Sequence, residues 1–329
     1  MKKINYILIL LLFFSSNTFG NNFDDWKNQF KQIAISNKIS EQTFDLVMKD
    51  VKFLPKVIEY DRYQPEFYED TKTYIDKRTS KKKLEKGLSF FNENKDLINT
   101  IEKDFNIEKE LLLSLMGIET NFGTYVGKMD ILSSLATLSY DKRRSEFFTS
   151  ELILLLKLID LGIVDKNKLY GSWAGAFGNF QFMPSTITNY AIDYDSNNQI
   201  DLKSIDDSFG SAANYLNKLG WQMNSPCFYK INLKKNTPPI LLNTSAKKIK
   251  NKKKIKYLKK YIVNSETIIA DDNLLAAFVT PDSDIIEDSK LLEPAYLVFN
   301  NYELILKWNR SLRFALAVCT LKNKFKNEL

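Results

Sequence analysis

The sequence predicts a mainly helical protein of the α+β class, and three features of its 329 residues point to this class. Gly and Pro are sparse, at 11 and 8 residues, whereas charged residues make up 26% of the chain. Most of the chain repeats its apolar residues every three or four positions, which is the spacing of amphipathic helices. Alternation of apolar and polar residues, the pattern of strands, is concentrated between residues 222 and 290. We therefore expect helical parts that surround a large core and carry one small β-rich insertion.

The first 20 residues have the pattern of a secretory signal peptide. Two lysines precede an apolar run that is too short to span a bilayer, and small and polar residues follow up to Gly20. No cysteine follows the apolar run, so we expect no lipid anchor and no stable membrane anchor. The alternative is a buried N-terminal helix. Residues 21–85 are then expected to form a helical region with an extended connector at 61–67, DRYQPEF.

The stretch LLLSLMGIETNFG, residues 111–123, predicts a buried helix, because nearly every residue before Glu119 is apolar. Glu119 shares one helix face with three apolar residues at helical spacing: Leu112, Leu115 and Met116. We expect Asn106 to be the N-cap, and Asn121 and Gly123 to end the helix.

Glu119 therefore lies in the last helical turn, where the helix dipole is negative. Burial and the dipole both favour the protonated form of a carboxyl group, so we expect the pKa of Glu119 to be raised. A carboxylic acid that stays protonated near neutral pH can act as a general acid. The alternative is a helix-end glutamate that faces the solvent.

Two more helices are expected between residues 131 and 162, and a stretch rich in glycine and aromatic residues follows at 171–187, GSWAGAFGNFQFMPSTI. Glycines allow close approach of the backbone, and aromatic rings offer flat faces. Such a loop suits the lining of a sugar cleft, with Ser172 and Gln181 as hydrogen-bonding groups. The alternative is a tight, well-packed turn.

Residues 193–207, DYDSNNQIDLKSIDD, carry oxygen-bearing side chains at alternate positions. Positions 1, 3, 5 and 7 of an EF-hand-type loop match four residues: Asp193, Asp195, Asn197 and Gln199. Asn198 replaces the usual glycine at position 6, and Asn tolerates the left-handed conformation. Position 12 is Ser204 instead of the usual glutamate, but Asp207 can close a longer loop. We predict a structural calcium ion here; the alternative is a solvated acidic turn.

Within the β-rich insertion, strands are predicted at 228–233 and 261–270, and a short strand within 271–290. A lysine run, AKKIKNKKKIKYLKK, lies between them at 246–260, and most such runs are solvated faces. The C-terminal part, residues 291–329, is predicted to be helical again.

Composition excludes several classes of site. The chain has no histidine, which rules out Ser-His-Asp and Cys-His catalysis and every His-ligated metal site. Two cysteines, Cys227 and Cys319, are too few for a thiolate metal cluster. They form one disulfide or remain buried thiols, and the sequence leaves both open. The formal charge of +7 allows attraction to an acidic polymer without being specific to nucleic acid.

Five separated motifs together resemble the lytic murein transglycosylases of the periplasmic B type, in the goose-type lysozyme superfamily. They are GIETNFG (117–123), LATLSYDKRR (135–144), GSWAGAFGNFQFMPSTITNYAID (171–193), SAANYLNKLGW (211–221) and WNRSLRFALAV (308–318). The connector DRYQPEF is also similar. The resemblance implies a lysozyme-like core at 86–221, completed by 291–329, with an additional helical domain. It also implies a periplasmic protein.

The resemblance further implies that Glu119 is the single catalytic acid and base. It implies glycan contacts at five positions: Tyr74, Ser172, Gln181, Tyr215 and Asn309. The implied calcium ligands are Asp193, Asp195, Asn197, the carbonyl of Gln199, and Asp207. Phe314 stands where the family usually has a tyrosine, so this chain lacks that hydroxyl group.

The implied reaction cleaves the β-1,4 bond between N-acetylmuramic acid (MurNAc) and N-acetylglucosamine (GlcNAc) without water, and needs no cofactor for the chemistry. Common glycosidases use two carboxylates, whereas the matching motifs hold one catalytic acid. The expected partners are peptidoglycan glycan strands and no nucleic acid. The alternatives are a hydrolytic muramidase on the same glycan and a non-catalytic peptidoglycan-binding scaffold.

Overall fold

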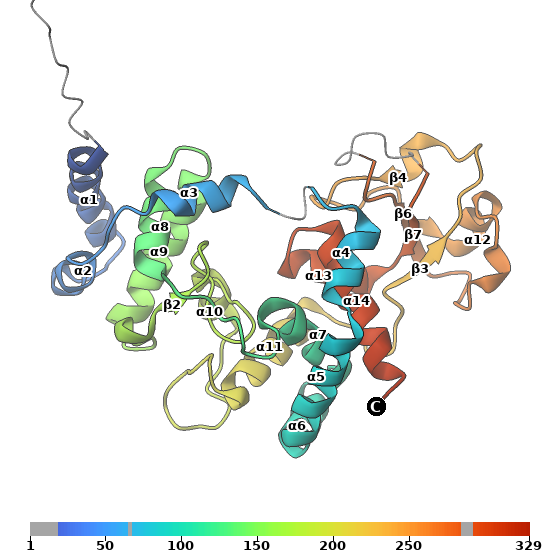
Figure 1. Ribbon diagram of the computed structural model, residues 1–329, viewed down its shortest axis with the longest axis horizontal. Coiled ribbons are helices and arrows are strands. Elements are labelled where there is room, and N and C mark those ends of the chain that lie inside the picture. Colours follow the sequence, from blue (N-terminus) through green and yellow to red (C-terminus); the bar gives the residue numbers. More distant parts are fainter. Residues whose placement is uncertain (1–18, 65–67, 284–291) are drawn as a thin grey trace, which may run out of the picture.

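The computed structural model describes residues 19–64, 68–283 and 292–329, and its first half is a succession of helices (Figure 1). In chain order they are α1 (Phe19–Ser36), α2 (Glu41–Met48), α3 (Pro55–Arg62), α4 (Thr71–Arg78), α5 (Lys81–Glu93), α6 (Lys95–Phe105), α7 (Lys109–Thr120), α8 (Ile131–Tyr140) and α9 (Ser145–Asp160). Nearly all of the predicted signal peptide and the end of the predicted connector lie outside the described residues. The predicted signal peptide therefore stays a prediction.

The second half combines helices with short strands. Its helices are α10 (Pro184–Tyr190), α11 (Ile205–Leu219), α12 (Ile255–Leu258), α13 (Asn300–Trp308) and α14 (Leu312–Lys326). Its strands are β2 (Tyr170–Gly171), β3 (Phe228–Ile231), β4 (Leu242–Asn243), β5 (Lys253–Lys254), β6 (Leu275–Val279) and β7 (Ala295–Val298). One more short strand, β1 (Met129–Asp130), lies in the first half between α7 and α8. The predicted class, mainly helical α+β, is confirmed.

The main sheet has the strand order β3-β7-β6-β4, with β5 paired to β6. Antiparallel pairing joins β7 to both β3 and β6, and β4 runs parallel to β6. The sequences of β6 and β7, LAAFV and AYLV, are almost wholly buried, which suits central strands covered on both faces. In Figure 1 this sheet and α12 lie at the opposite end of the molecule from α1 and α2.

Two secondary-structure predictions for the insertion are wrong. The strand predicted at 261–270 is replaced by 3-10 turns and loop. Turns bury the side chains of Ile262 and Ile268 against the sheet, while neighbouring residues stay exposed. The same alternation of apolar and polar residues is typical of a strand, which is why the sequence pattern predicted one. The sheet also continues beyond residue 290, because β7 lies where helices were predicted to resume.

Helix α7 occupies the centre of the helical part, in contact with α5, α6, α11 and α14. Leu112 and Leu115 are fully buried and Met116 nearly so, which confirms the predicted buried helix. Asn121, in the left-handed conformation with φ of 51°, ends it as predicted. The predicted N-cap is wrong, because Glu108 takes that place and Asn106 ends α6. Asn106 tolerates a φ of 54°, which suits the end of a helix better than a start.

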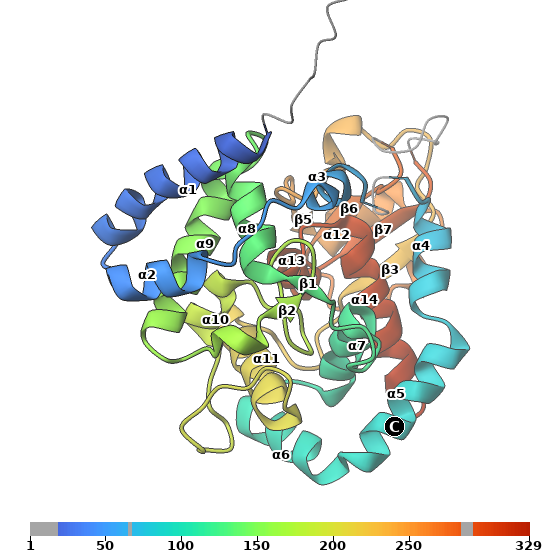
Figure 2. The ribbon, with the colours of Figure 1, turned by 60° about the vertical axis from the view of Figure 1, so that its left-hand side comes forward.

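The N-terminal helices form a second helical block, in which α1 and α2 lie beside α8 and α9 (Figures 1 and 2). Aromatic rings fill the space between them: Phe23 stacks on Trp26 at 5.4 Å and meets the edge of Tyr140 at 5.5 Å. The hydroxyl groups of Ser133 and Thr137 on α8 accept hydrogen bonds from backbone N–H groups just before α3. Because α3 leads on to α4, these contacts connect the block to the part that carries α7.

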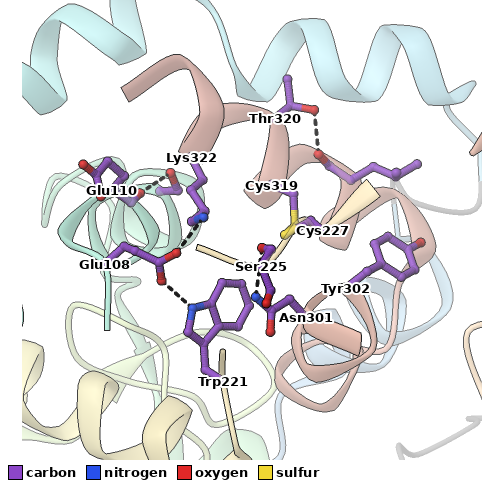
Figure 3. Close-up of a disulfide and its surroundings, with 12 residues drawn as sticks. Glu108, Glu110, Trp221, Ser225, Cys227, Asn301, Tyr302, Cys319, Thr320 and Lys322 are labelled. Carbon is purple, nitrogen blue, oxygen red and sulfur yellow. Dashed lines mark hydrogen bonds and ion pairs between the residues drawn. A yellow bond between two sulfur atoms is a disulfide. The ribbon is translucent and has the colours of Figure 1, made fainter. Parts of the chain in front are cut away.

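A disulfide between Cys227 and Cys319 joins the chain just before β3 to the middle of α14 (Figure 3). Beside it, Glu108 forms an ion pair of 2.9 Å with Lys322 and accepts a hydrogen bond from the indole of Trp221. All three of these charged or polar side chains are at least nine-tenths buried. The insertion, α7, α11 and α14 are therefore tied together at one place.

Candidate active site

Glu119 lies in the last turn of α7 and is half-buried, with its carboxyl group turned toward the end of α13. The indole nitrogen Nε1 of Trp308 donates a hydrogen bond of 3.1 Å to Oε1 of Glu119. An indole N–H can only donate, so Oε1 acts as the acceptor and an acidic proton on this carboxyl group belongs on Oε2. Trp308 thus orients the acid and was not among the functional residues that the sequence predicted.

A pocket of about 410 Å³ opens beside Glu119. Its walls are the start of α5 and the end of α7, with lining residues Ser80, Lys82, Lys83, Lys86, Ile118, Glu119, Thr120, Asn121 and Tyr125. Among these described lining residues, Glu119 is the one carboxylate. The pocket therefore offers a single carboxyl group that can act as both acid and base.

Lysines from α5 cover the carbonyl end of α7. The Nζ atom of Lys83 donates to the carbonyl of Gly117 at 2.5 Å, and that of Lys86 donates to the carbonyl of Asn121 at 2.8 Å. Burial lowers the pKa of Lys83, and the charges of Arg78 and Lys86 lower it further. These cations counteract the negative helix dipole, which was one of the two reasons to expect a raised pKa for Glu119. The raised pKa of Glu119 stays a prediction.

A hydrogen-bond chain fixes the end of α7 to the glycine-rich loop. Thr120 Oγ1 donates to the carbonyl of Asn179 at 2.8 Å. The Nδ2 atom of Asn179 donates in turn to Ser208 Oγ at 3.0 Å and to two carbonyl groups at the start of α11. One buried asparagine therefore connects α7, the loop and α11, and holds the backbone next to Glu119 in place.

The loop predicted to line a sugar cleft is tightly folded. Ser172 and Ala176 exchange hydrogen bonds, through backbone atoms at 2.8 Å and through Ser172 Oγ at 3.0 Å. Gln181 has a φ of 51° and donates from Nε2 to the carbonyls of Gly178 and Val126. Both side chains are half-exposed and bonded within the loop or to the segment after α7, so the structure shows the packed turn and leaves glycan contact untested.

Gly127 allows the glycine-rich loop to lie very close to the segment that follows α7. Its φ is +87°, and a Cβ atom built there would lie 2.0 Å from the carbonyl oxygen of Gly171. Only glycine fits a backbone that passes another backbone at this distance. The segment after Glu119 and the glycine-rich loop are thereby pressed together, where β1 pairs with β2.

A stack of aromatic rings packs against Trp308. Its ring lies 5.1 Å from the ring of Tyr215, which lies 4.2 Å from that of Tyr190, all close to parallel. Phe182 meets the edge of Trp308 at 5.4 Å. Burial, with a smaller contribution from Tyr190, raises the pKa of Tyr215 to about 12. Tyr215 donates its hydroxyl to the carbonyl of Lys307 at 3.2 Å, so it holds the segment that carries Trp308.

The other two predicted glycan-contact residues lie on different elements, and neither lines the Glu119 pocket. Asn309 directly follows Trp308, at the C-terminal end of α13, and is half-buried. Tyr74 is buried on α4, with the guanidinium carbon of Arg78 3.5 Å from its ring centre, and does not line the Glu119 pocket. Phe314 is buried in α14.

The predicted calcium loop brings three carboxylates together. One oxygen of each of Asp193, Asp195 and Asp207 lies within 4.8 Å of the others. Asp207 is fully buried and accepts backbone hydrogen bonds from Tyr194 and Asp201. Burial, and then the charge of Asp195, raise the pKa of Asp207. Such a set of hard oxygen donors fits calcium chemistry.

The rest of the loop is held by hydrogen bonds among its own residues. Asn198 takes a φ of 67°, the left-handed conformation expected at the position of the missing glycine. The backbone N–H groups of Asn197 and Asn198 donate to the carboxylate of Asp193. Asn197 Oδ1 accepts a hydrogen bond from the backbone of Gln199. The loop is distinct from the Glu119 pocket, because none of its residues lines that pocket.

The chain matches the family described as "Transglycosylase SLT domain" over residues 22–323. It is 30% identical over 248 residues to "Membrane-bound lytic murein transglycosylase B" of Escherichia coli (strain K12). That match covers 72% of this chain and 62% of the relative, so the chain spans less than two thirds of the relative's length.

Two solved structures share the fold. SltB3 of Pseudomonas aeruginosa, in complex with NAG-NAM-pentapeptide, has a TM-score of 0.80 and 30% identity, covering 92% of this chain and 79% of that one. Slt35 of Escherichia coli, in complex with calcium, has a TM-score of 0.75 and 25% identity, covering 92% and 93% of the two chains. In the part of the chain that the structure describes, no helix is long and apolar enough to cross a membrane.

Proposed function

The chain belongs to the transglycosylase SLT domain family, among the B-type lytic murein transglycosylases, as its motifs predicted, and from this membership we propose its activity. We propose that it cleaves the β-1,4 bond between MurNAc and GlcNAc in peptidoglycan strands and releases 1,6-anhydromuramyl products. The observation that carries the proposal is the pocket in which Glu119 is the one carboxylate among the described lining residues.

A single carboxylate suffices because the substrate supplies the nucleophile. The protonated Oε2 of Glu119 donates its proton to the leaving oxygen of GlcNAc as the bond from C1 to that oxygen breaks. The resulting carboxylate then takes the proton of the MurNAc 6-hydroxyl, whose oxygen forms the new bond to C1. Glu119 returns to its protonated state, and no water enters the product. Common glycosidases need the second carboxylate to activate water or to attack C1 themselves.

The structure supports each half of this cycle. The hydrogen bond from Trp308 leaves Oε2 to carry the proton and stabilises the carboxylate that forms after transfer. Attack by a hydroxyl of the same sugar is effectively unimolecular, which removes much of the entropy cost. Positioned acid and base catalysis adds roughly 10² to 10⁴-fold.

Glu119→Gln tests this proposal. Gln has nearly the same shape, so the helix should keep its packing, but it can neither give nor accept the proton. We expect release of 1,6-anhydromuropeptides from purified peptidoglycan to fall by at least about a hundredfold, with an unchanged thermal melt. Glu110→Gln, on the first turn of the same helix and outside the pocket, is the matched control and should keep full activity.

The products separate this function from its alternatives. A hydrolytic muramidase would release sugars that are heavier than the anhydro products by one water. A non-catalytic scaffold would release neither product from the wild type while still binding the glycan. Substantial residual release by the folded Glu119→Gln protein would mean that another group carries the chemistry.

We also propose one structural calcium ion, held by Asp193, Asp195 and Asp207 with Asn197 and the carbonyl of Gln199. The close carboxylates support it, and calcium is present in a structure of the similar protein Slt35. At a hundred times its Kd, calcium should raise the melting temperature by roughly 5 °C. Asp193→Asn should abolish the shift, whereas Asp206→Asn, in the same stretch but outside the cluster, should keep it. A wild type without any shift at millimolar calcium would contradict the site.

We propose that the chain works in the periplasm after loss of residues 1–20, with peptidoglycan strands and no nucleic acid as partners. The Cys227–Cys319 disulfide supports an oxidising compartment. Labelling of the N-terminus of the exported protein decides the cleavage site: a sequence that begins at Met1 would contradict this proposal.

A further inference from the structure

The second half of the lysine run forms an exposed surface of the β-rich insertion. Strand β5 leads directly into α12, and a 3-10 turn follows. In α12 the side chains of Ile255 and Leu258 are buried, so Lys256 and Tyr257 lie on its outer side, where both are exposed. Figure 1 shows α12 at the outer edge of the insertion, at the opposite end of the molecule from α1 and α2.

Exposed apolar side chains lie next to these lysines. The backbone N–H of Ile255 donates to the carbonyl of Leu274 at 3.0 Å, and Lys254 pairs with Leu275 across β5 and β6. Leu274 is 40% exposed, Leu275 56% and Tyr257 58%. We call this surface the outer face of the insertion, and it consists of Lys253, Lys254, Lys256, Tyr257, Leu274 and Leu275.

Positive charge dominates the outer face. Its three lysines have no ion pair with any residue in the described part of the chain, whereas two other members of the run do. Lys252 pairs with Glu303 at 2.8 Å, and Lys259 pairs with Asp272 at 2.5 Å. Asp271 is the carboxylate that remains beside the face without an ion pair. Three cations against one carboxylate leave an excess that attracts an anionic partner.

The mixture of lysines with exposed leucine and tyrosine side chains indicates the kind of partner. Solubility accounts for the lysines but not for large apolar side chains between them. A lysine has a long apolar stem, so its ammonium group can reach a phosphate while the neighbouring apolar side chains enter a less polar layer. Basic residues alternating with aromatic and aliphatic ones are typical of surfaces that lie in the interface of an anionic bilayer.

Another protein strand fits the outer face less well. Strand β5 lies at the edge of the sheet, with β6 as its partner. Lysines on an edge strand oppose the addition of a further strand, because they keep their charge in water and repel a second copy of themselves. The outer face therefore disfavours both a second copy of the chain and a peptide that would extend the sheet.

We propose that the outer face of the insertion binds the surface of an anionic phospholipid membrane, peripherally and reversibly. The inference goes beyond the proposed function and does not depend on it. None of the residues of the outer face lines the Glu119 pocket, so a protein bound in this way keeps that pocket open to substrate. The insertion would thus hold the protein at a membrane without a membrane-spanning segment.

Sedimentation with vesicles tests the proposal on the exported protein. We compare vesicles of phosphatidylcholine alone with vesicles that also contain phosphatidylglycerol. The protein should partition at least about tenfold more strongly onto the anionic vesicles. This preference should shrink between 0.1 and 1 M salt, where the Debye length falls from about 10 to about 3 Å. Equal partitioning onto both kinds of vesicle, or no binding to either, would overturn the proposal.

Matched variants locate the charge effect. Each lysine near an anionic membrane strengthens binding roughly fivefold, so Lys253→Gln/Lys254→Gln should weaken partitioning about 10- to 30-fold. Lys49→Gln/Lys56→Gln removes the same charge from two exposed lysines, at the end of α2 and in the first turn of α3, and should change partitioning little. Thermal melts of both variants should match the wild type, because all four side chains are exposed. Equal losses in the two variants would show a general charge effect and overturn the proposal.

An apolar variant separates a membrane from other anionic partners. Leu275→Ser keeps every charge of the outer face and should weaken binding to anionic vesicles about tenfold, with an unchanged melt. A soluble polyanion, polyglutamate, should bind weakly and show no difference between Leu275→Ser and the wild type. If polyglutamate binds as strongly as the vesicles do, and Leu275→Ser leaves vesicle binding unchanged, then the lysines attract any polyanion and the proposal is wrong.

Discussion

Removal of the Cys227–Cys319 disulfide should destabilise the protein measurably. The bridge closes a loop across 92 positions, from the start of the β-rich insertion to α14. Cys319 is fully buried and Cys227 is 7% exposed, so both sulfur atoms also contribute to the core. We expect Cys227→Ala/Cys319→Ala to lower the free energy of unfolding and to loosen the insertion.

The magnitude follows from the length of the loop. For a separation of 92 residues, the chain-entropy relation gives about 4.6 kcal/mol at 25 °C. This is an upper value, because residual structure in the unfolded chain already removes part of the entropy that the bridge would remove. We therefore expect a loss of about 3 to 4.6 kcal/mol, which is a large share of the stability of a typical domain.

Equilibrium denaturation in guanidinium measures this loss in three samples: the oxidised wild type, the wild type in reductant, and the double variant. The reduced wild type and the double variant should agree within about 1 kcal/mol, and reductant should leave the double variant unchanged. Release of anhydro product should persist in all three, since neither cysteine lines the Glu119 pocket. A loss below about 1 kcal/mol on reduction, with complete reduction verified by thiol labelling, would refute the reasoning.

Two more predictions concern buried polar contacts. Trp308→Phe keeps the aromatic stack but removes the hydrogen-bond donor to Glu119. Because a hydrogen bond to a charged group contributes about 1.5 to 3 kcal/mol, we expect kcat to fall about 10- to 100-fold with little change in KM. Tyr215→Phe keeps the stack and the donor, and should retain most activity; an equal loss in both variants would show that the stack, and not the indole N–H, matters. Burial alone would raise the pKa of Glu108, but the ion pair with Lys322 and the hydrogen bonds from Asn224 and Trp221 outweigh it, and the pKa is lowered from 4.5. Its stabilisation is therefore fully present above about pH 4.5 and is lost as the pH falls through the lowered pKa. Glu108→Gln/Lys322→Met should flatten this acid limb in thermal melts between pH 3 and 6, and an unchanged limb would refute the assignment.

The sequence revealed the parts of the site that depend on local pattern. Apolar periodicity identified α7 as buried, and Asn121 marked its end, because both signals come from neighbours along one helix. The acidic loop was visible because its oxygen-bearing side chains follow one another at alternate positions. The alternation at 261–270 misled, since turns buried the same side chains that a strand would bury.

The rest of the site depends on contacts between distant segments. Trp308 and Glu119 are 189 positions apart, and no local pattern marks a tryptophan as the donor to a particular carboxyl group. No sequence pattern distinguished the lysines of α5, and two of them bond to carbonyl groups at the end of α7. The disulfide could not be decided from two cysteines, because pairing depends on the Cα–Cα distance of 6.1 Å that the fold creates.

The position of Glu119 results from restraints at both ends of α7. At the N-terminal end, Glu108 joins the helix to α14 and to the end of α11. At the C-terminal end, Thr120 is bonded to the glycine-rich loop, and Lys83 and Lys86 hold the last carbonyls. An acid that first gives a proton and then takes one must face two different oxygen atoms of the substrate in turn. A carboxyl group on a helix fixed in this way, and oriented by Trp308, can do so without moving, so in the proposed reaction the substrate rearranges around a stationary acid.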